Sequence, residues 1–98
     1  MKLTKSQIKY LRSLAHKLKP VVRVGQNGLT ENVMDEVRNA LERHELVKIK
    51  INVGERQERD DVLGKISEET KSECIQKIGN VAVLFRRNAQ NPVISLAK

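Results

Sequence analysis

The stretch Val21-Val22-Arg23-Val24-Gly25-Gln26-Asn27-Gly28-Leu29-Thr30 decides how the chain is organised. Three valines around one arginine predict a short strand over residues 21–24, and the two glycines end it abruptly. Thr30 is a good N-cap for the helical pattern that follows, so the stretch predicts a strand, a tight loop and a helix. Free backbone N–H groups at the foot of a helix suit an anion. We therefore expect this loop to hold phosphate groups, although a plain strand-to-helix turn is the alternative.

Hydrophobic periodicity predicts the other elements on both sides of this loop. A helix is expected over residues 3–18, opened by the capping-box spacing of Thr4 and Gln7, and a second over residues 30–44. Residues 46–53 alternate apolar and polar side chains, which predicts a strand with one face in the core and the other at least partly in water. A third helix is expected over about residues 58–70, followed by strands at 74–78 and 81–86 that a tight turn at Gly79-Asn80 joins.

This order, α-β-α-β-α-β-β, predicts an α/β (α+β) fold in one domain over residues 1–98. Strand–helix–strand units favour parallel neighbours with right-handed crossovers, and the closing hairpin adds an antiparallel pair. We therefore expect a four-stranded mixed sheet packed with helices. Residues 88–98 are expected to form an irregular tail whose few apolar side chains could dock on the domain.

Positive charge is concentrated at the start of the chain. The net charge is +7, residues 1–30 carry seven Lys and Arg and no acid, and all twelve acids lie between Glu31 and Glu73. Such asymmetry favours a polyanion-binding end, although a solvated surface is the alternative. We expect one surface to combine the Gly25–Gly28 loop with a helical stripe and with cations next to the loop. The stripe is Lys5, Lys9, Arg12 and His16, and the neighbouring cations are Lys17, Lys19 and Arg23.

Composition limits the ways in which the chain could bind a nucleic acid. Aromatic residues make up only 2%, so the usual platforms for base stacking are scarce and binding should rest on backbone and shape. The single cysteine, Cys74, allows no internal disulfide, fits a reducing compartment and is expected to lie buried in a strand. No apolar run could span a membrane and no signal peptide is apparent, so we expect a cytoplasmic protein.

Other chemistry finds little support in the sequence. His16, His44 and Cys74 lack the spacing of metal ligands, and His44 is expected to cap or pack at a helix end. The acidic cluster that begins at Glu55 is better explained as a solvated helix start. The loop lacks the Lys-Ser/Thr of a Walker motif, and no nucleophile has a recognisable context. We expect no metal, no cofactor and no enzymatic activity.

Three segments together resemble the CRM domain, the chloroplast RNA splicing and ribosome maturation family, in its single-domain bacterial form. They are Ser13-Leu14-Ala15-His16-Lys17-Leu18-Lys19-Pro20-Val21-Val22, the run Gly25-Gln26-Asn27-Gly28-Leu29-Thr30, and Ala40-Leu41-Glu42-Arg43-His44-Glu45-Leu46-Val47-Lys48-Ile49-Lys50. The resemblance implies an RNA-binding fold similar to the C-terminal domain of translation initiation factor 3. It also implies association with precursors of the large ribosomal subunit in bacteria, and plant relatives serve in group II intron splicing.

Carried over onto this sequence, the resemblance places the family's GxxG loop at Gly25, Gln26, Asn27 and Gly28. Its basic surroundings fall on Lys17, Lys19, Arg23, Lys48 and Lys50. We therefore expect a monomeric RNA-binding protein that contacts ribosomal RNA of the large-subunit precursor, with ribosomal proteins as further partners and no membrane. The alternative is an adaptor that reaches the ribosome through an acidic protein surface without touching RNA.

Overall fold

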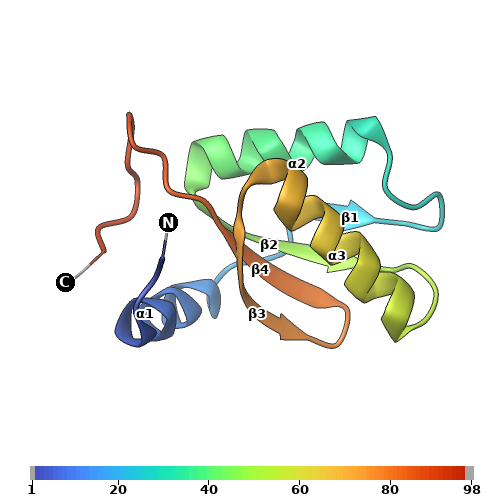
Figure 1. Ribbon diagram of the computed structural model, residues 1–98, viewed down its shortest axis with the longest axis horizontal. Helices are drawn as coiled ribbons and strands as arrows, with labels where there is room; N and C mark the ends of the chain where they lie inside the picture. Colours follow the sequence, from blue (N-terminus) through green and yellow to red (C-terminus); the bar gives the residue numbers. More distant parts are fainter. Residues whose placement is uncertain (1, 97–98) are drawn as a thin grey trace.

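The computed structural model describes residues 2–96, which form three helices and four strands in the predicted order (Figure 1). The elements are α1 (Lys5–Ala15), β1 (Val22–Val24), α2 (Glu31–His44), β2 (Leu46–Ile51), α3 (Arg56–Thr70), β3 (Glu73–Ile78) and β4 (Val81–Phe85). The strands form one sheet in the order β1-β2-β4-β3. Strand β1 is parallel to β2, and the other neighbours are antiparallel. The predicted fold, with its four-stranded mixed sheet, is confirmed.

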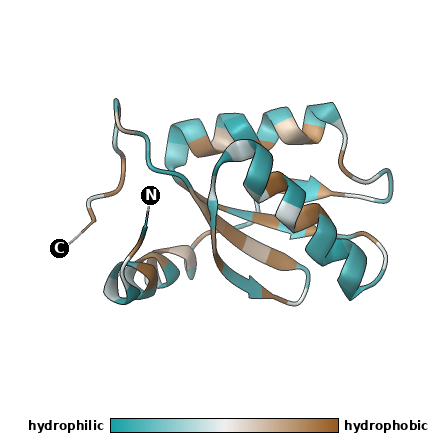
Figure 2. Cartoon of the chain, in the orientation of Figure 1, coloured by the Kyte–Doolittle hydropathy of each residue, from teal (hydrophilic) through white to brown (hydrophobic). Residues whose placement is uncertain are grey.

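The helices cover the two faces of the sheet unequally (Figure 1). Helices α2 and α3 pack on one face, where Val37, Leu41 and Ile66 meet Val24 and Ile49 in the larger hydrophobic cluster. Helix α1 packs on the other face, against a smaller cluster formed by Leu46, Ile75, Val83 and Phe85. The outward sides of α2 and α3 are largely hydrophilic, as expected of helices that bury one face only (Figure 2).

Part of the sheet face that carries α1 stays open to solvent. Strand β2 buries Ile49 and Ile51 on the α2 side, whereas Lys48 and Lys50 point to the α1 side and are half-buried. On the same face, Val21 next to β1 and Ile78 on the edge strand β3 remain 56% and 66% exposed. The expectation of a strand with one core face and one partly wet face is therefore confirmed, because α1 covers only one end of that face.

Capping hydrogen bonds fix the starts of the first two helices, as predicted. Thr4 Oγ1 accepts from the N–H of Gln7 at 3.1 Å, and Gln7 Oε1 accepts from the N–H of Thr4 at 2.9 Å. Thr30 Oγ1 accepts from the N–H of Val33 at 3.2 Å. Helix α1, however, ends at Ala15 and not at residue 18. The N–H groups of residues 17 and 18 donate to carbonyls three residues back, so the chain tightens into turns ahead of Pro20.

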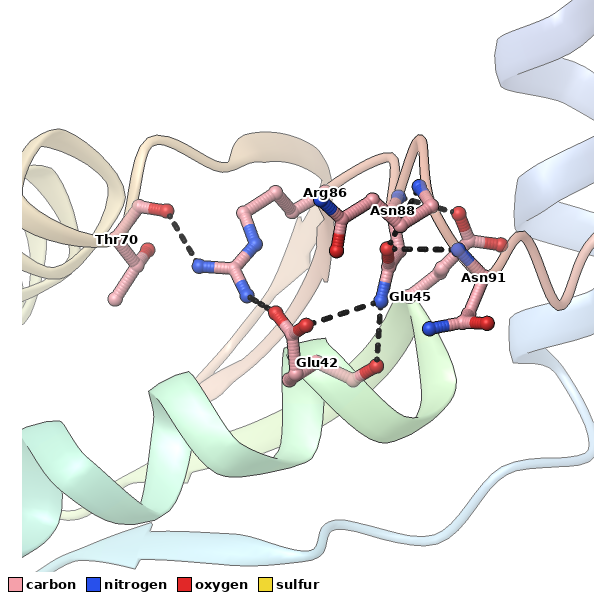
Figure 3. Close-up of polar contacts among 7 residues, drawn as sticks. Glu42, Glu45, Thr70, Arg86, Asn88 and Asn91 are labelled. Carbon is pink, nitrogen blue, oxygen red and sulfur yellow. Dashed lines mark hydrogen bonds and ion pairs between the residues drawn. The ribbon is translucent and has the colours of Figure 1, made fainter.

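The tail is irregular, as predicted, but it is firmly attached over its described part. Glu45 Oε2 accepts from the N–H of Asn88 at 2.6 Å, and Oε1 accepts from those of Val93 and Ile94, each at 2.7 Å. Asn88 in turn donates to the carbonyl and carboxylate oxygens of Glu42 (Figure 3). Ile94 and Leu96 pack against the cluster under α1. Residues 97–98 of the predicted tail lie outside the described residues.

Cys74 differs from the expectation of a buried cysteine, because its side chain is exposed. It lies on β3, which is an edge strand, opposite the fully buried Leu84 of β4. A bulge between Cys74 and Gln76 interrupts the strand at this point. The apolar residue of β3 that enters the core is Ile75, on the α1 side.

Candidate nucleic-acid interface

The Gly25–Gly28 loop follows β1 directly and projects from one end of the molecule (Figure 1). The N–H of Gly28 donates to the carbonyl of Gly25 at 3.0 Å, which closes a tight turn. Gly28 has a φ of 74°, a conformation that favours glycine, whereas a Cβ at Gly25 would meet nothing within 4 Å. Of the two glycines, only Gly28 is therefore required by the turn itself. Gln26 and Asn27 are exposed at its tip.

The loop has a basic side and an acidic side. On the acidic side, a hollow of about 260 Å³ lies between the loop and Glu58 of α3, and Glu31 begins α2. On the other side, Arg23 precedes the loop and is the register partner of Lys50. A phosphate approaching from the Arg23 side meets cations, whereas one approaching from α3 meets a carboxylate. The cations therefore lie on the β1 and β2 side of the loop, and Glu58 lies on the α3 side.

Strand alternation brings three of the predicted cations to one sheet face. Val22 and Val24 enter the core under α2, so Arg23 between them points to the opposite face, as do Lys48 and Lys50 of β2. Within residues 2–96, the cations that form ion pairs with Asp or Glu are Arg38, Lys77, Arg86 and Arg87, none of which belongs to the predicted site. We name Gly25, Gln26, Asn27, Gly28, Arg23, Lys48 and Lys50 the loop surface.

Lys17 and Lys19 extend this basic region away from the loop. Together with Lys48 they line a groove of about 490 Å³ between the end of α1, the start of β2 and the tail. His44, expected to cap or pack at a helix end, is the last residue of α2 and lies exposed on the wall of the same groove. We name this the lysine groove.

The α1 stripe, which consists of Lys5, Lys9, Arg12 and His16, does not join the loop. All four residues are exposed, and Arg12 Nε donates to the carbonyl of Ile75 on β3, at the far edge of the sheet from β1. Figure 1 shows α1 and the Gly25–Gly28 loop at opposite ends of the molecule. The expected single surface is therefore not formed, because β1 carries the chain away from α1 before the loop begins.

Sequence reasoning missed Glu45, the residue between α2 and β2. Its side chain is fully buried, and its backbone has a φ of 63°, a region that non-glycine residues rarely adopt. Burial alone would raise the pKa of Glu45, but the N–H groups of Ile94, Asn88 and Val93 and the charge of Arg87 outweigh it, so the pKa lies below its ordinary value. The sequence did carry one signal, because Glu45 alone connects the expected helix and strand where a glycine usually ends a helix.

Among residues 2–96, no group of three or more His, Cys, Asp or Glu side chains is arranged to hold a metal ion. A membrane-crossing helix would need more length and more apolar residues than any helix in the same range has.

The fold and the loop surface define an α/β domain in which cations that form no ion pair within residues 2–96 lie next to a glycine turn. The model of the CRS1/YhbY (CRM) domain matches residues 3–86, and the chain belongs to this family. A Haemophilus influenzae protein named "RNA-binding protein" is 44% identical over 84 residues, which cover 86% of this chain and 85% of the relative. Bacillus subtilis YqeI, named "Probable RNA-binding protein", is 34% identical over 94 residues, which cover 96% and 98%.

A solved structure supports the same relationship. The solution structure of a Staphylococcus aureus protein, described as a candidate RNA-binding protein, matches with a TM-score of 0.81 and 34% sequence identity. The match covers 98% of this chain and 100% of that one. The similarity therefore extends over the whole architecture, including the tail region beyond the family match.

Proposed function

We propose that this chain binds RNA through the loop surface, with Lys17 and Lys19 as further phosphate contacts. The observation that carries the proposal is the set of cations on the α1-side face of β1 and β2. Arg23, Lys48 and Lys50 form no ion pair within residues 2–96, and they lead to a turn whose tip is exposed. A phosphate backbone supplies the negative charge that these residues lack. The names of the relatives, which refer to RNA binding, agree with this proposal.

We infer further that the RNA belongs to precursors of the large ribosomal subunit and that the chain acts, in the cytoplasm, in their assembly. The support is family membership together with a surface that offers phosphate contacts and few groups able to read bases. A tagged chain should sediment with large-subunit precursors. Crosslinking followed by mapping of the RNA contacts should place residues 25–28 on ribosomal RNA.

The salt dependence of binding to naked RNA tests the direct contact. If about four phosphates are contacted, the logarithm of the binding constant should fall with the logarithm of salt concentration at a slope near −3. The probe is a fragment of large-subunit ribosomal RNA, measured by fluorescence anisotropy. A flat salt response, or binding only in the presence of ribosomal proteins, would establish the adaptor alternative.

A pair of matched variants separates the loop surface from overall charge. Lys50→Glu and Lys65→Glu change the net charge equally, but Lys50 belongs to the loop surface and Lys65 is exposed on α3, which packs on the other sheet face. We expect Lys50→Glu to weaken RNA binding about tenfold and to reduce the salt slope by about one. Lys65→Glu should change the affinity by less than about twofold, the effect of a remote charge screened by salt. Equal effects from both variants would contradict the assignment.

A further inference from the structure

The lysine groove combines an apolar floor, of which Leu18 and Val21 are the exposed side chains, with a basic rim. The floor consists of Leu14, Leu18, Val21, Leu46, Val47 and Ile94, and the rim of Lys17, Lys19, Lys48 and His44. Leu18 and Val21 are 37% and 56% exposed, although both are large aliphatic side chains. A contiguous exposed apolar patch bordered by polar residues often marks a binding site, whereas single scattered apolar residues on a surface do not. None of the residues that build this groove is acidic.

A second groove, which shares Val21 and His44 with the lysine groove, provides a comparison within the same molecule. It is larger, about 680 Å³, but Glu36 and Glu42 line it together with Arg43. Its charges are mixed, whereas those of the lysine groove are all positive or neutral. The partner that complements the lysine groove is therefore an anion that also presents an apolar face.

The lysine groove is continuous with the loop surface. Val21 donates its N–H to the carbonyl of Lys48 at 2.9 Å, so the pairing of β1 with β2 continues into the groove. Val21 and Arg23 are exposed on the same side of the strand, with Val22 buried between them. Val21 and Gly25 are four residues apart, about 13 Å along an extended strand. A polyanion held at Gly25–Gly28 that follows β1 would pass Arg23 and then reach the groove.

We propose that the lysine groove binds an unstacked nucleobase of a single RNA strand, whose phosphates lie on Lys17, Lys19 and Lys48. The proposal rests on the RNA binding proposed above and names the part of the RNA that this site takes. A base presents flat faces of low polarity that pack against aliphatic side chains, and its sugar-phosphate supplies the anion. The two aromatic residues do not serve this surface, since Phe85 is only 1% exposed and Tyr10 lies on α1 outside the groove lining. The aliphatic floor provides the base contact that aromatic platforms supply in other RNA-binding modules.

The test compares protein variants and RNA variants in one cycle. Leu18→Ser and Val21→Ser are combined, because both side chains are partly exposed and their loss should lower Tm by only a few degrees. Ile78→Ser, at a position 66% exposed on the edge strand β3, is the matched control. Each protein is titrated against a short single-stranded RNA of random sequence and against an abasic ribose-phosphate strand of the same length.

The groove variant should bind the single strand about fivefold more weakly than the wild type, with an unchanged salt slope, because apolar contact and not charge is lost. It should bind the abasic strand as the wild type does, and Ile78→Ser should match the wild type with both strands. Equal binding of the single strand by the groove variant and the wild type would overturn the proposal, as would equal weakening on both strands. An acidic amphipathic peptide is titrated in parallel. If the groove variant binds both strands as the wild type does but no longer binds this peptide, the site belongs to a protein partner and the nucleobase assignment is wrong. Failure of the wild type to bind either strand at low salt would remove the proposed function itself, a result distinct from the others.

Discussion

Glu45 holds three separate backbone N–H groups of the tail, and replacing it with glutamine tests how much of the stability depends on its charge. Glutamine keeps one oxygen, which can still accept from the N–H groups of Val93 and Ile94. Its amide nitrogen, however, would face the N–H of Asn88, which now lies 2.6 Å from a carboxylate oxygen. The variant therefore sets two donors against each other in a site where Glu45 is fully buried. It also removes the attraction to Arg87, whose Nη1 lies 3.6 Å from the carboxylate.

The expected loss follows from these contacts. An unsatisfied buried donor costs about 1–3 kcal/mol, and weakening the charge-assisted bonds that remain adds to it. We expect Glu45→Gln to lower the free energy of unfolding by about 2–4 kcal/mol, which corresponds to about 10–20 °C in Tm for a domain of this size. Urea denaturation followed by circular dichroism measures this directly. Glu42→Gln is the control, because Glu42 pairs with Arg86 but its side chain is 64% exposed, and such pairs contribute less than about 1 kcal/mol.

The pH dependence gives a second measure of the same group. Because the pKa of Glu45 in the folded chain lies below its ordinary value, ionised Glu45 stabilises the fold at pH values above that ordinary value. This stabilisation should disappear as the pH falls through the lowered pKa of the folded state. The stability difference between wild type and Glu45→Gln should therefore be largest near neutral pH and shrink in acid. A difference below about 0.5 kcal/mol at pH 7, or one that does not change with pH, would refute the role assigned to the carboxylate.

Three further predictions concern the loop and the α1 stripe. Replacing Gln26 and Asn27 with aspartate should weaken RNA binding about tenfold or more without lowering Tm, since both side chains are exposed at the turn. Fluorescence anisotropy and thermal melting measure the two effects. An unchanged affinity would show that the loop is not part of the interface. Gly28→Ala should lower the free energy of unfolding by about 1 kcal/mol because of the φ of 74°, whereas Gly25→Ala should change it by less than about 0.5 kcal/mol. Chemical denaturation compares the two variants, and equal losses would contradict the turn geometry. Reversing the charges of Lys5 and Lys9 should leave the affinity for a short single strand within about twofold of the wild type, because helix α1 lies far from the loop. The same change should flatten the salt slope for a long structured RNA. Loss of short-strand binding would show that the two regions act together.

Local sequence signals predicted most of the fold because each acts over a few residues. The alternation of Val47, Lys48, Ile49 and Lys50 predicted both the strand and its two faces, and the structure confirms them. The capping box at Thr4 predicted the start of α1 through hydrogen bonds that span three residues. Such patterns need no knowledge of the rest of the chain, and they also indicated the order of the elements.

Tertiary placement explains what sequence reasoning could not predict. The face of the sheet that α1 covers depends on the path of residues 16–21, and no periodicity encodes that path. The exposure of Cys74 depends on β3 being an edge strand, which follows from the strand order. The role of Glu45 could not be predicted for a related reason, since its side chain accepts hydrogen bonds from residues that lie 43 to 49 positions later in the chain. Its strained backbone is tolerated because those contacts fix its side chain.

The separation of the two basic regions limits the kind of RNA that could use both. The molecule is 39 Å long, and Figure 1 places helix α1 and the loop toward opposite ends of this long dimension. A few nucleotides held at Gly25–Gly28 can reach the lysine groove along β1, but they cannot also reach Lys5 and Lys9. An RNA that contacts every predicted cation must therefore be long enough to pass around the domain or be folded so that two of its segments meet the two regions. A folded RNA would satisfy this condition, whereas a short single strand would use the loop surface and the groove alone.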